Sequence, residues 1–378
     1  MAIGDITYGE DEIFESVCPY ELNIAALDET HFAVVYQDTS GKVCIGTVSG
    51  TTITFGSVYT FHALGTAYPD ITVLDSTHIA ISFQGDTTNG GVIIGTVSND
   101  DEIAFGSEVT FNATAPSYCA IAATDSTHFT IAYQDAGGGD GYGHTRSAVV
   151  SGGDTITLGD EDTFNAATTT QINIDALDSS HVAISYKDDG NTNKATSIVG
   201  VLANDDEMTF GSEVVFDNSA PSHVKVVALD STHFITSFKD SGDGYLNSCA
   251  AVVTSGDTIT YGSQYTIDTD DCYYGAAVKL NSTQFISTYW SNTSSSSLSK
   301  IGTIASDDEI SFGSDYEFLA GAAYFAAVTA LSTTKIVDAY GDGNNSNYGT
   351  ALIGEVEAAP APEVGGGYPS TLSLLGVG

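Results

Sequence analysis

Five short segments of the chain place a histidine three residues after an aspartate, a pairing that can transfer a proton or bind a metal ion. The segments read LDETHF, LDSTHI, TDSTHF, LDSSHV and LDSTHF. A histidine oriented by a carboxylate is common at catalytic and metal sites. The histidines that would carry this chemistry are His31, His78, His128, His181 and His233.

The spacing of these segments favours a structural role instead. Their aspartates are Asp28, Asp75, Asp125, Asp178 and Asp230, and degenerate copies follow at Asn281 and Ser332, with steps of 47, 50, 53, 52, 51 and 51 residues. Histidines one repeat apart cannot converge on one ion or substrate. We interpret the motif as a repeated turn in which the aspartate accepts backbone N–H groups.

Each repeat predicts four short strands. The second repeat reads YPDITVL, HIAISFQ, GVIIGTVS and EIAFGSEVTF, with Gly, Asp, Asn and Ser at the turns between them. The glycine of FGS recurs in step with the turn motif, from Gly56 to Gly313. Four antiparallel strands about every 50 residues are typical of a β-propeller blade. The repeats number seven, so we predict an all-β, seven-bladed propeller.

The last repeat, near residues 322–356, has three strands and lacks the FGS strand. The N-terminal segment ITYGEDEIF matches ITLGDEDTF of residues 156–164 at most positions. We therefore predict that segment 5–14 completes the last blade, so that residues 1–357 form one domain. Closure removes exposed sheet edges. The chain resembles repeat-type seven-bladed β-propellers over residues 5–357, and in its Ser/Thr/Gly-rich, Lys-poor composition it is similar to propeller proteins of phage particles and cell surfaces.

The charge of the chain restricts its partners. Nine Lys and Arg stand against 49 Asp and Glu, a net charge of −40. Such a surface repels nucleic acid and anionic lipid, so we expect no nucleic-acid partner. The chain has neither a signal-peptide pattern nor an apolar run of 18 residues, so we expect no membrane insertion. We expect it on a virion or an extracellular surface.

A ring of side chains is predicted where the inner strands begin. Loops between second and third strands vary in sequence on this top face, whereas the turns on the bottom face are uniform, and variable loops on a fixed scaffold usually carry recognition. Seven residues before each repeat marker stand Glu21, Tyr68, Tyr118, Gln171, His223, Tyr274 and Phe325. Tyrosine packing between blades is the alternative. The candidate ligand-binding residues are Tyr20, Tyr68, Tyr118, His223, Tyr274 and Tyr324.

Three top loops carry oxygen ligands that calcium prefers. None matches a complete EF-hand pattern, and ordinary hairpin turns explain the same residues. We expect no other cofactor. The candidate calcium ligands are Asp189, Asn191, Asn193, Asp240, Asp243, Asp342 and Asn344.

Motifs of common enzymes are missing: the chain has no GxSxG, HExxH, P-loop or Cys/His zinc spacing. Asp70 and Asp175 both fall on inner strands, as an isolated carboxylate pair on the channel. We predict that the protein is not an enzyme. A polysaccharide lyase or hydrolase would require one of these two acids.

The composition changes after residue 357. Segment 358–378 is rich in Pro and Gly and ends in a short apolar peptide, which predicts a linker followed by a docking tail. Its candidate contact residues are Tyr368, Leu372, Leu374, Leu375 and Val377.

These patterns predict a non-enzymatic structural or decoration protein of a larger assembly, most consistent with a virion. The tail would anchor it to other structural subunits, and the propeller would be displayed. The alternative is a carbohydrate-binding propeller, a lectin or adhesin, which uses the aromatic top ring to bind surface glycans.

Overall fold

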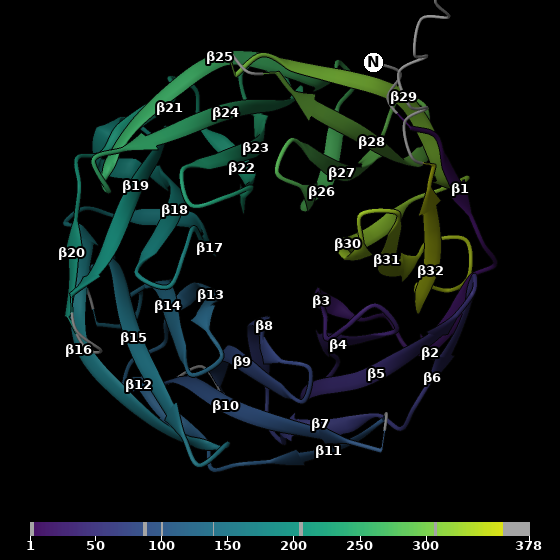
Figure 1. Ribbon diagram of the computed structural model, residues 1–378, viewed down its shortest axis with the longest axis horizontal. Helices are drawn as coiled ribbons and strands as arrows, with labels where there is room; N and C mark the ends of the chain where they lie inside the picture. Colours follow the sequence, from purple (N-terminus) through teal and green to yellow (C-terminus); the bar gives the residue numbers. More distant parts are fainter. Residues whose placement is uncertain are drawn as a thin grey trace, which may run out of the picture.

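A ring of seven antiparallel sheets surrounds a central channel in the computed structural model, which describes residues 4–85, 89–99, 101–138, 140–203, 207–305 and 308–357. Figure 1 views this ring along the channel, with the sheets as its blades. The predicted all-β, seven-bladed propeller is therefore confirmed. The tail 358–378 lies outside the described residues.

Each blade runs from an inner strand at the channel to an outer strand, and the blades are numbered one to seven along the chain (Figure 1). The inner strands are β3 (Tyr20–Ala26), β8 (Thr66–Asp75), β13 (Ser117–Asp125), β17 (Thr169–Ala176), β22 (Pro221–Ala228), β26 (Cys272–Asn281) and β30 (Ala323–Ser332). The second strands are β4 (His31–Gln37), β9 (His78–Gly85), β14 (His128–Gln134), β18 (His181–Asp188), β23 (His233–Asp240), β27 (Gln284–Ser291) and β31 (Lys335–Asp342).

The third strands form the next layer outward. They are β5 (Gly41–Ser49), β10 (Asn89–Ser98), β15 (Gly143–Ser151), β19 (Lys194–Ala203), β24 (Leu246–Thr254), β28 (Ser296–Ile304) and β32 (Tyr348–Val356). Three outer strands are continuous: β16 (Thr155–Asn165), β25 (Thr258–Asp268) and β29 (Ile310–Leu319). Four are split in two: β6 (Thr52–Phe55) and β7 (Tyr59–His62), β11 (Glu102–Phe105) and β12 (Val109–Asn112), β20 (Glu207–Phe210) and β21 (Val214–Asp217), β1 (Ile6–Tyr8) and β2 (Glu12–Glu15).

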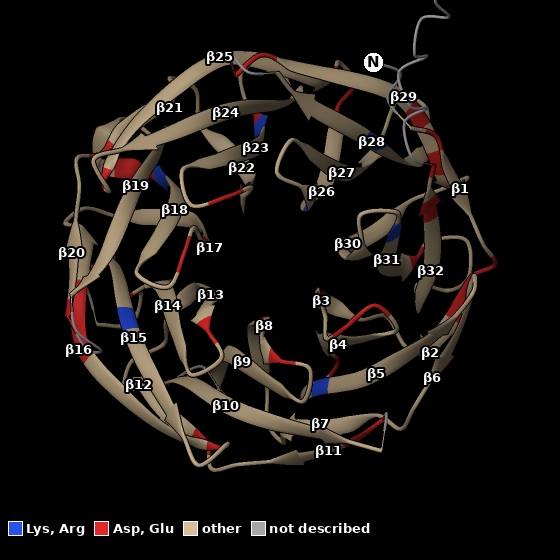
Figure 2. Cartoon of the chain, in the orientation of Figure 1, with Lys and Arg blue, Asp and Glu red and all other residues tan. Residues whose placement is uncertain are grey.

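Helix is nearly absent from the described part of the chain, where a single 3-10 turn, η1 (Asp189–Asn191), occurs. None of the described residues forms a helix long and apolar enough to cross a membrane. Figure 2 shows acidic residues around the whole ring and few basic ones, as the composition requires.

The N-terminus closes the ring as predicted. Strand β1 pairs with β32 in the register Ile6↔Val356, and β2 extends the same edge with Glu12↔Ala351. In Figure 1 the purple β1 and the yellow β32 run side by side. The outer strand of blade seven is thus supplied from the opposite end of the chain.

Neighbouring blades pack large side chains against small ones. Phe32, Val34 and Tyr36 of β4 lie in one apolar cluster with Val337 and Ala339 of blade seven. The opposite face of β4 packs against blade two. Both faces of each sheet are therefore buried against neighbours, as the alternating aromatic and small residues of the second strands predict.

Two of the FGS glycines lie where neighbouring blades approach closely. A Cβ added at Gly56 would lie 2.4 Å from the Cβ of Asp101, in the outer turn of the next blade. At Gly211 it would lie 2.3 Å from the carbonyl oxygen of Asp257. A side chain has no space there, which explains why this glycine keeps the period of the blades.

Loss of the buried aromatic side chain on the closing strand is expected to destabilise the whole ring. Phe14 on β2 is 7% exposed and packs against Tyr36 and Phe55, with ring centroids 5.3 and 5.4 Å apart. Phe14→Ala should lower the free energy of unfolding by roughly 3–5 kcal/mol in urea denaturation. Ile13→Ala, on the same strand but 42% exposed, is the matched control and should cost far less. Equal losses in the two variants would contradict this closure.

A buried acid in blade seven predicts an unusual pH dependence. Asp338 is fully buried, accepts a hydrogen bond from Thr288 Oγ1 of blade six (2.8 Å), and burial raises its pKa from 3.8 to about 7. The fold therefore favours the protonated acid. This contribution to stability is complete below about pH 4, is lost as the pH rises to about 7, and changes no further above that.

Asp338→Asn cannot ionise and should remove this loss. In urea denaturation between pH 4.5 and 8, the variant should gain on the unchanged protein with rising pH, by on the order of a few kcal/mol at pH 8. A constant difference between the two proteins across this range would show that Asp338 does not titrate in the window.

Candidate functional site

Seven residues at the top of the channel share an uncommon backbone conformation. Each has a positive φ, between 47° and 55°, in the left-handed region that few residues other than glycine adopt. In every blade the register between inner and second strand shifts at this point, as in a β-bulge. These are the seven predicted ring positions: Glu21, Tyr68, Tyr118, Gln171, His223, Tyr274 and Phe325.

The repeated bulge has a cost and an effect. A left-handed backbone costs a non-glycine residue about 1 kcal/mol or more, yet none of the seven is glycine. A bulge turns a side chain away from the direction that the strand would give it. Strain of this kind clusters at binding and catalytic sites, because the surrounding structure must hold it in place. The seven positions are therefore candidates for function.

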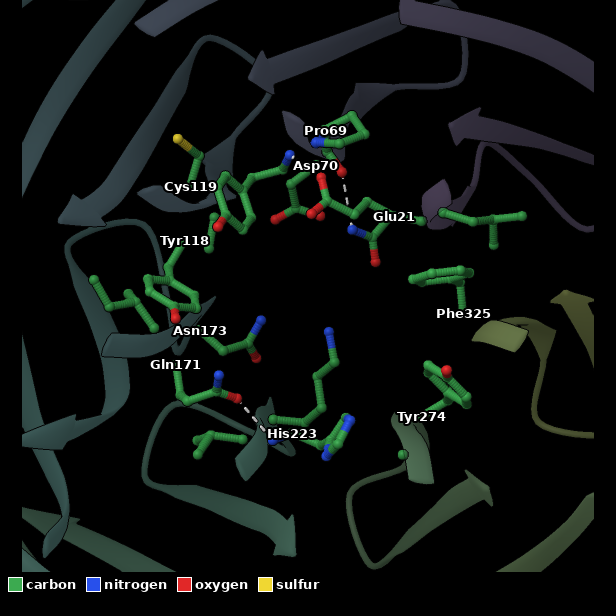
Figure 3. Close-up of a pocket in the computed structure, with 18 of the residues that line it drawn as sticks. Glu21, Pro69, Asp70, Tyr118, Cys119, Gln171, Asn173, His223, Tyr274 and Phe325 are labelled. Atoms are coloured by element: carbon green, nitrogen blue, oxygen red, sulfur yellow. Dashed lines mark hydrogen bonds between the residues drawn. The ribbon is translucent and has the colours of Figure 1, made fainter. Parts of the chain in front are cut away.

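These side chains surround a cavity of about 940 Å³, including its open mouth. Figure 3 shows Tyr118, Gln171, His223, Tyr274 and Phe325 around the central opening. The rings form two pairs, Tyr68 with Tyr118 and Tyr274 with Phe325, each with centroids 5.3 Å apart. The floor adds polar side chains from the next inward positions of the inner strands: Asn23, Asp70, Asn173 and Lys225.

The structure brings together four of the six candidate ligand residues. Tyr68, Tyr118, His223 and Tyr274 line the cavity. Tyr20 and Tyr324 do not. Tyr20 is 49% exposed and packs edge-on against Phe325 with centroids 5.7 Å apart, and Tyr324 lies 5.8 Å from the ring of Tyr274. They precede the bulge and pack against ring residues, and ligand binding by these two tyrosines stays a prediction.

Hydrogen bonds between neighbouring blades define the channel wall. The amide of Asn23 donates to the carbonyl oxygen of Pro69 (3.0 Å), and the N–H of Ile121 donates to Asp70 (2.9 Å). Asn173 accepts from the N–H of Val226 (2.8 Å). Side chains of one inner strand thus pair the free edge of the next, where no further strand lies.

Asp175 has the same structural role as Asp70. Its carboxylate accepts from the N–H of Ala228 at 2.8 Å, and burial raises its pKa to about 6. Burial also raises the pKa of Asp70. The isolated carboxylate pair noticed in the sequence is therefore engaged in contacts between blades.

Lys225 differs from the other floor residues. Its ammonium group makes no hydrogen bond or ion pair with any residue of the described ranges, although burial lowers its pKa and the nearby charge of Asp70 opposes that effect. Lys225 is half-buried at the cavity, and an ammonium group there without a protein partner is free to bind a ligand oxygen. The sequence analysis did not single out Lys225, because its unfilled donor is visible only in the structure.

The five histidine motifs form turns on the bottom face. Asp28 accepts from the backbone N–H groups of Thr30 (2.6 Å) and His31 (2.9 Å), and its carboxylate lies 2.9 Å from His31 Nδ1. Burial opposes ionisation of Asp28, but the hydrogen bonds from Thr30 and His31 outweigh it and lower the pKa. The contacts with the N–H two residues on and with histidine Nδ1 recur at Asp75, Asp125, Asp178 and Asp230, and the histidine N–H also donates to Asp178 and Asp230. The structural interpretation of this motif agrees with these contacts.

The candidate calcium loops are ordered by turn hydrogen bonds. Asp240 accepts from the N–H of Gly242 (2.6 Å), Asp243 from Tyr245 (2.9 Å) and Asp342 from Asn344 (2.8 Å). Asp189 pairs with Lys187 at 2.9 Å, and Asn191 ends the 3-10 turn ahead of Asn193, whose φ is +64°. Calcium binding at these loops stays a prediction.

Comparison with known proteins supports the fold. No family model matches the chain, and no curated sequence matches it. A protein of unknown function from Dyadobacter fermentans aligns with a TM-score of 0.55 and 8% identity, over 93% of this chain and 99% of that one. A mutant of AofleA from Arthrobotrys oligospora aligns with a TM-score of 0.51 and 11% identity, over 83% of this chain and 93% of that one. At such low identity the likeness shows the propeller fold alone.

His223 is expected to remain uncharged at the channel mouth. Burial, together with the charges of Lys239 and Lys225, lowers its pKa from 6.5 to about 4. An NMR titration of the imidazole should therefore show its midpoint near pH 4. Lys225→Met should raise this midpoint, but not to 6.5, because burial is the larger cause. A midpoint near 6.5 in the unchanged protein would contradict the enclosure of this ring.

Proposed function

We propose that the protein is a carbohydrate-binding propeller that holds a glycan in the cavity at the top of its channel. The observation that carries the proposal is the ring of seven strained bulges, which direct side chains of different chemistry into one open cavity. Aromatic faces stack on the apolar faces of sugar rings, and amides, acids and an ammonium group pair with hydroxyls.

The arrangement of the lining supports a sugar more than a flat apolar ligand. Tyr68 and Tyr118 come from adjacent blades, and Tyr274 and Phe325 from another adjacent pair. Between them lie Gln171 and His223, whose ring is neutral near pH 7 because its pKa is about 4. Lys225 supplies an unfilled donor below them. Aromatic contacts and hydrogen-bonding groups thus alternate around the opening.

The engagement of two channel acids, Asp70 and Asp175, supports a non-catalytic role. A hydrolase would need Asp70 or Asp175 to meet a substrate, whereas each accepts a backbone N–H of the next blade. We therefore propose binding without turnover.

Membership of a virion or another surface assembly also stays a proposal. It was inferred from the charge, the composition and the tail, and the tail residues Tyr368, Leu372, Leu374, Leu375 and Val377 lie outside the described residues. Glycan binding by a decoration protein of a particle would be consistent with both proposals. Deletion of 358–378 should abolish assembly and leave the propeller folded.

Glycan binding should depend on the three cavity tyrosines. The full chain is applied to a glycan array, and the best ligand is titrated against a variant carrying Tyr68→Ala, Tyr118→Ala and Tyr274→Ala. At about 1 kcal/mol for each aromatic contact, affinity should fall roughly 100-fold. Tyr245→Ala is the matched control, since this tyrosine lies in a top loop of blade five and does not line the cavity.

Lys225→Met provides a second test with no loss of aromatic packing. It should weaken binding of the same glycan and leave the melting temperature nearly unchanged. Absence of binding to every glycan on the array would overturn the proposal, as would equal affinity of the triple-tyrosine variant and the Tyr245 control.

A further inference from the structure

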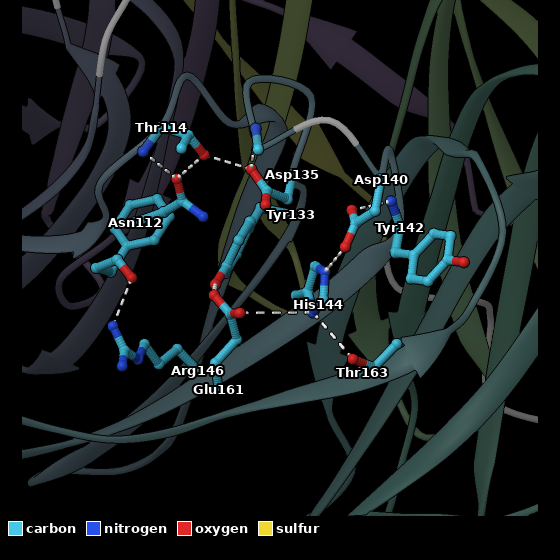
Figure 4. Close-up of polar contacts among 12 residues, drawn as sticks. Asn112, Thr114, Tyr133, Asp135, Asp140, Tyr142, His144, Arg146, Glu161 and Thr163 are labelled. Atoms are coloured by element: carbon cyan, nitrogen blue, oxygen red, sulfur yellow. Dashed lines mark hydrogen bonds and ion pairs between the residues drawn. The ribbon is translucent and has the colours of Figure 1, made fainter.

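A second cluster with metal-binding chemistry lies on blade three, away from the channel. The loop between β14 and β15 carries Asp135 and Asp140, and His144 follows on β15. The ligand atoms of these three side chains all lie within 4.8 Å of one another, and they form the sole group of three or more His, Cys, Asp or Glu in such proximity among the described residues. Figure 4 shows Asp140 directly beside His144.

His144 carries the unusual feature. The residue is 5% exposed, and its Nε2 is buried without a hydrogen-bond partner among the described residues. Asp140 Oδ2 lies 3.7 Å from this nitrogen, which is too long for a hydrogen bond. A buried ring nitrogen next to a carboxylate that it does not reach leaves space for a shared ion.

The opposite side of the imidazole is held in place. His144 Nδ1 lies 3.1 Å from Thr163 Oγ1 and 3.9 Å from Glu161 Oε1. A carboxylate and a hydroxyl at Nδ1 favour the tautomer with its proton there, so the lone pair of Nε2 points into the cluster. Outer partners of this kind usually orient metal-binding histidines.

Both acids keep one oxygen free for a ligand. Asp135 accepts from the N–H of Gly138 (2.9 Å) and from the hydroxyl of Thr114 through Oδ1. Asp140 accepts from the N–H of Tyr142 through Oδ1 (2.9 Å). The turn hydrogen bonds therefore fix each carboxylate while Oδ2 remains available.

The cluster is not a repeated part of the blade. His144 pairs across the strands with Tyr133, and the corresponding partners of the second-strand aromatics in the other blades are Lys42, Gly91, Thr196, Asn247, Leu298 and Thr350. His62 also has a buried, unpartnered Nε2, but it faces the single acid Glu108 through Nδ1. Among the residues that the structure describes, blade three alone combines the buried imidazole with two oriented carboxylates.

We propose that Asp135, Asp140 and His144 bind one divalent transition-metal ion, for which Zn²⁺ is the test. Calcium and magnesium prefer oxygen ligands alone, whereas an imidazole with carboxylates is typical of zinc and its neighbours. Two ligands of one zinc ion, each about 2.1 Å away, are separated by about 3.4 Å in tetrahedral geometry, close to the 3.7 Å between His144 and Asp140. Water completes the coordination, and the ion holds the long loop to the blade.

The test is calorimetric titration of the full chain with ZnCl₂ after treatment with EDTA. One ion should bind per chain. We expect a Kd of about 10 μM or tighter, as for a zinc site with few protein ligands. Co²⁺ should give the visible bands of a tetrahedral complex. Asp140→Asn keeps the side-chain oxygen that accepts from the Tyr142 N–H, and it should weaken Zn²⁺ binding at least tenfold. His144→Gln should abolish binding.

Matched controls exist in the same chain. Asp243→Asn makes the same change from carboxylate to amide at the equivalent turn residue, which accepts from the Tyr245 N–H, in a blade with Asn247 in place of His144. His62→Gln removes an imidazole of similar burial. Neither should change zinc affinity. The proposal is overturned if the unchanged protein binds no zinc, or if Asp140→Asn and Asp243→Asn have the same affinity.

Discussion

Each blade is stable only because both of its faces are covered by neighbours. A single four-stranded sheet of this chain would expose an aromatic face on one side and a small apolar face on the other, and the ring covers both. The free end of such an array would leave one face open, so the ring must close. Pairing of β1 and β2 with β32 joins residues about 350 positions apart and makes the stability of every blade depend on one contact.

The features of the fold that recur in every blade could be predicted from the sequence. The spacing of the Asp-His turns determined the number of blades, alternation in the second strands indicated the packing faces, and the match of segment 6–14 with 156–164 located the closing strand. These features can be predicted without a structure, because the repeat length and the alternation of apolar residues are both visible in the sequence. The ring positions were found for the same reason, since they keep a constant distance from the turn.

The lining of the cavity could be predicted only in part. Tyr20 and Tyr324 are neighbours of ring residues in the chain, yet they lie outside the cavity, because the bulge turns one side chain inward and leaves its predecessor behind. A left-handed backbone at tyrosine or glutamine has no signature in residue type, unlike one at glycine. Nor does the sequence show that Lys225 lacks a partner while Asn173 has one.

The metal-binding cluster on blade three was not predicted from the sequence, for a different reason. Its acids lie in a loop, but its histidine lies on the following strand, so no spacing rule for a single loop brings them together. The calcium prediction rested on oxygen-bearing loop residues, whereas an imidazole ligand changes the preferred metal. The pairing of β14 with β15 sets His144 opposite Tyr133, and this register places the histidine near the loop that carries the two acids.

Repetition and variation have opposite meanings in this protein. The Asp-His turn keeps both its residue types and its hydrogen bonds over five blades, as expected of a part that the fold needs many times. At the ring the backbone is the same in seven blades, even to a strained φ, while the side chains range from glutamate to phenylalanine. Seven copies of a strained conformation are costly to maintain for packing alone, since glycine would relieve each one. A shared geometry with diverse side chains instead fits the proposed binding of one asymmetric ligand at the end of a symmetric channel.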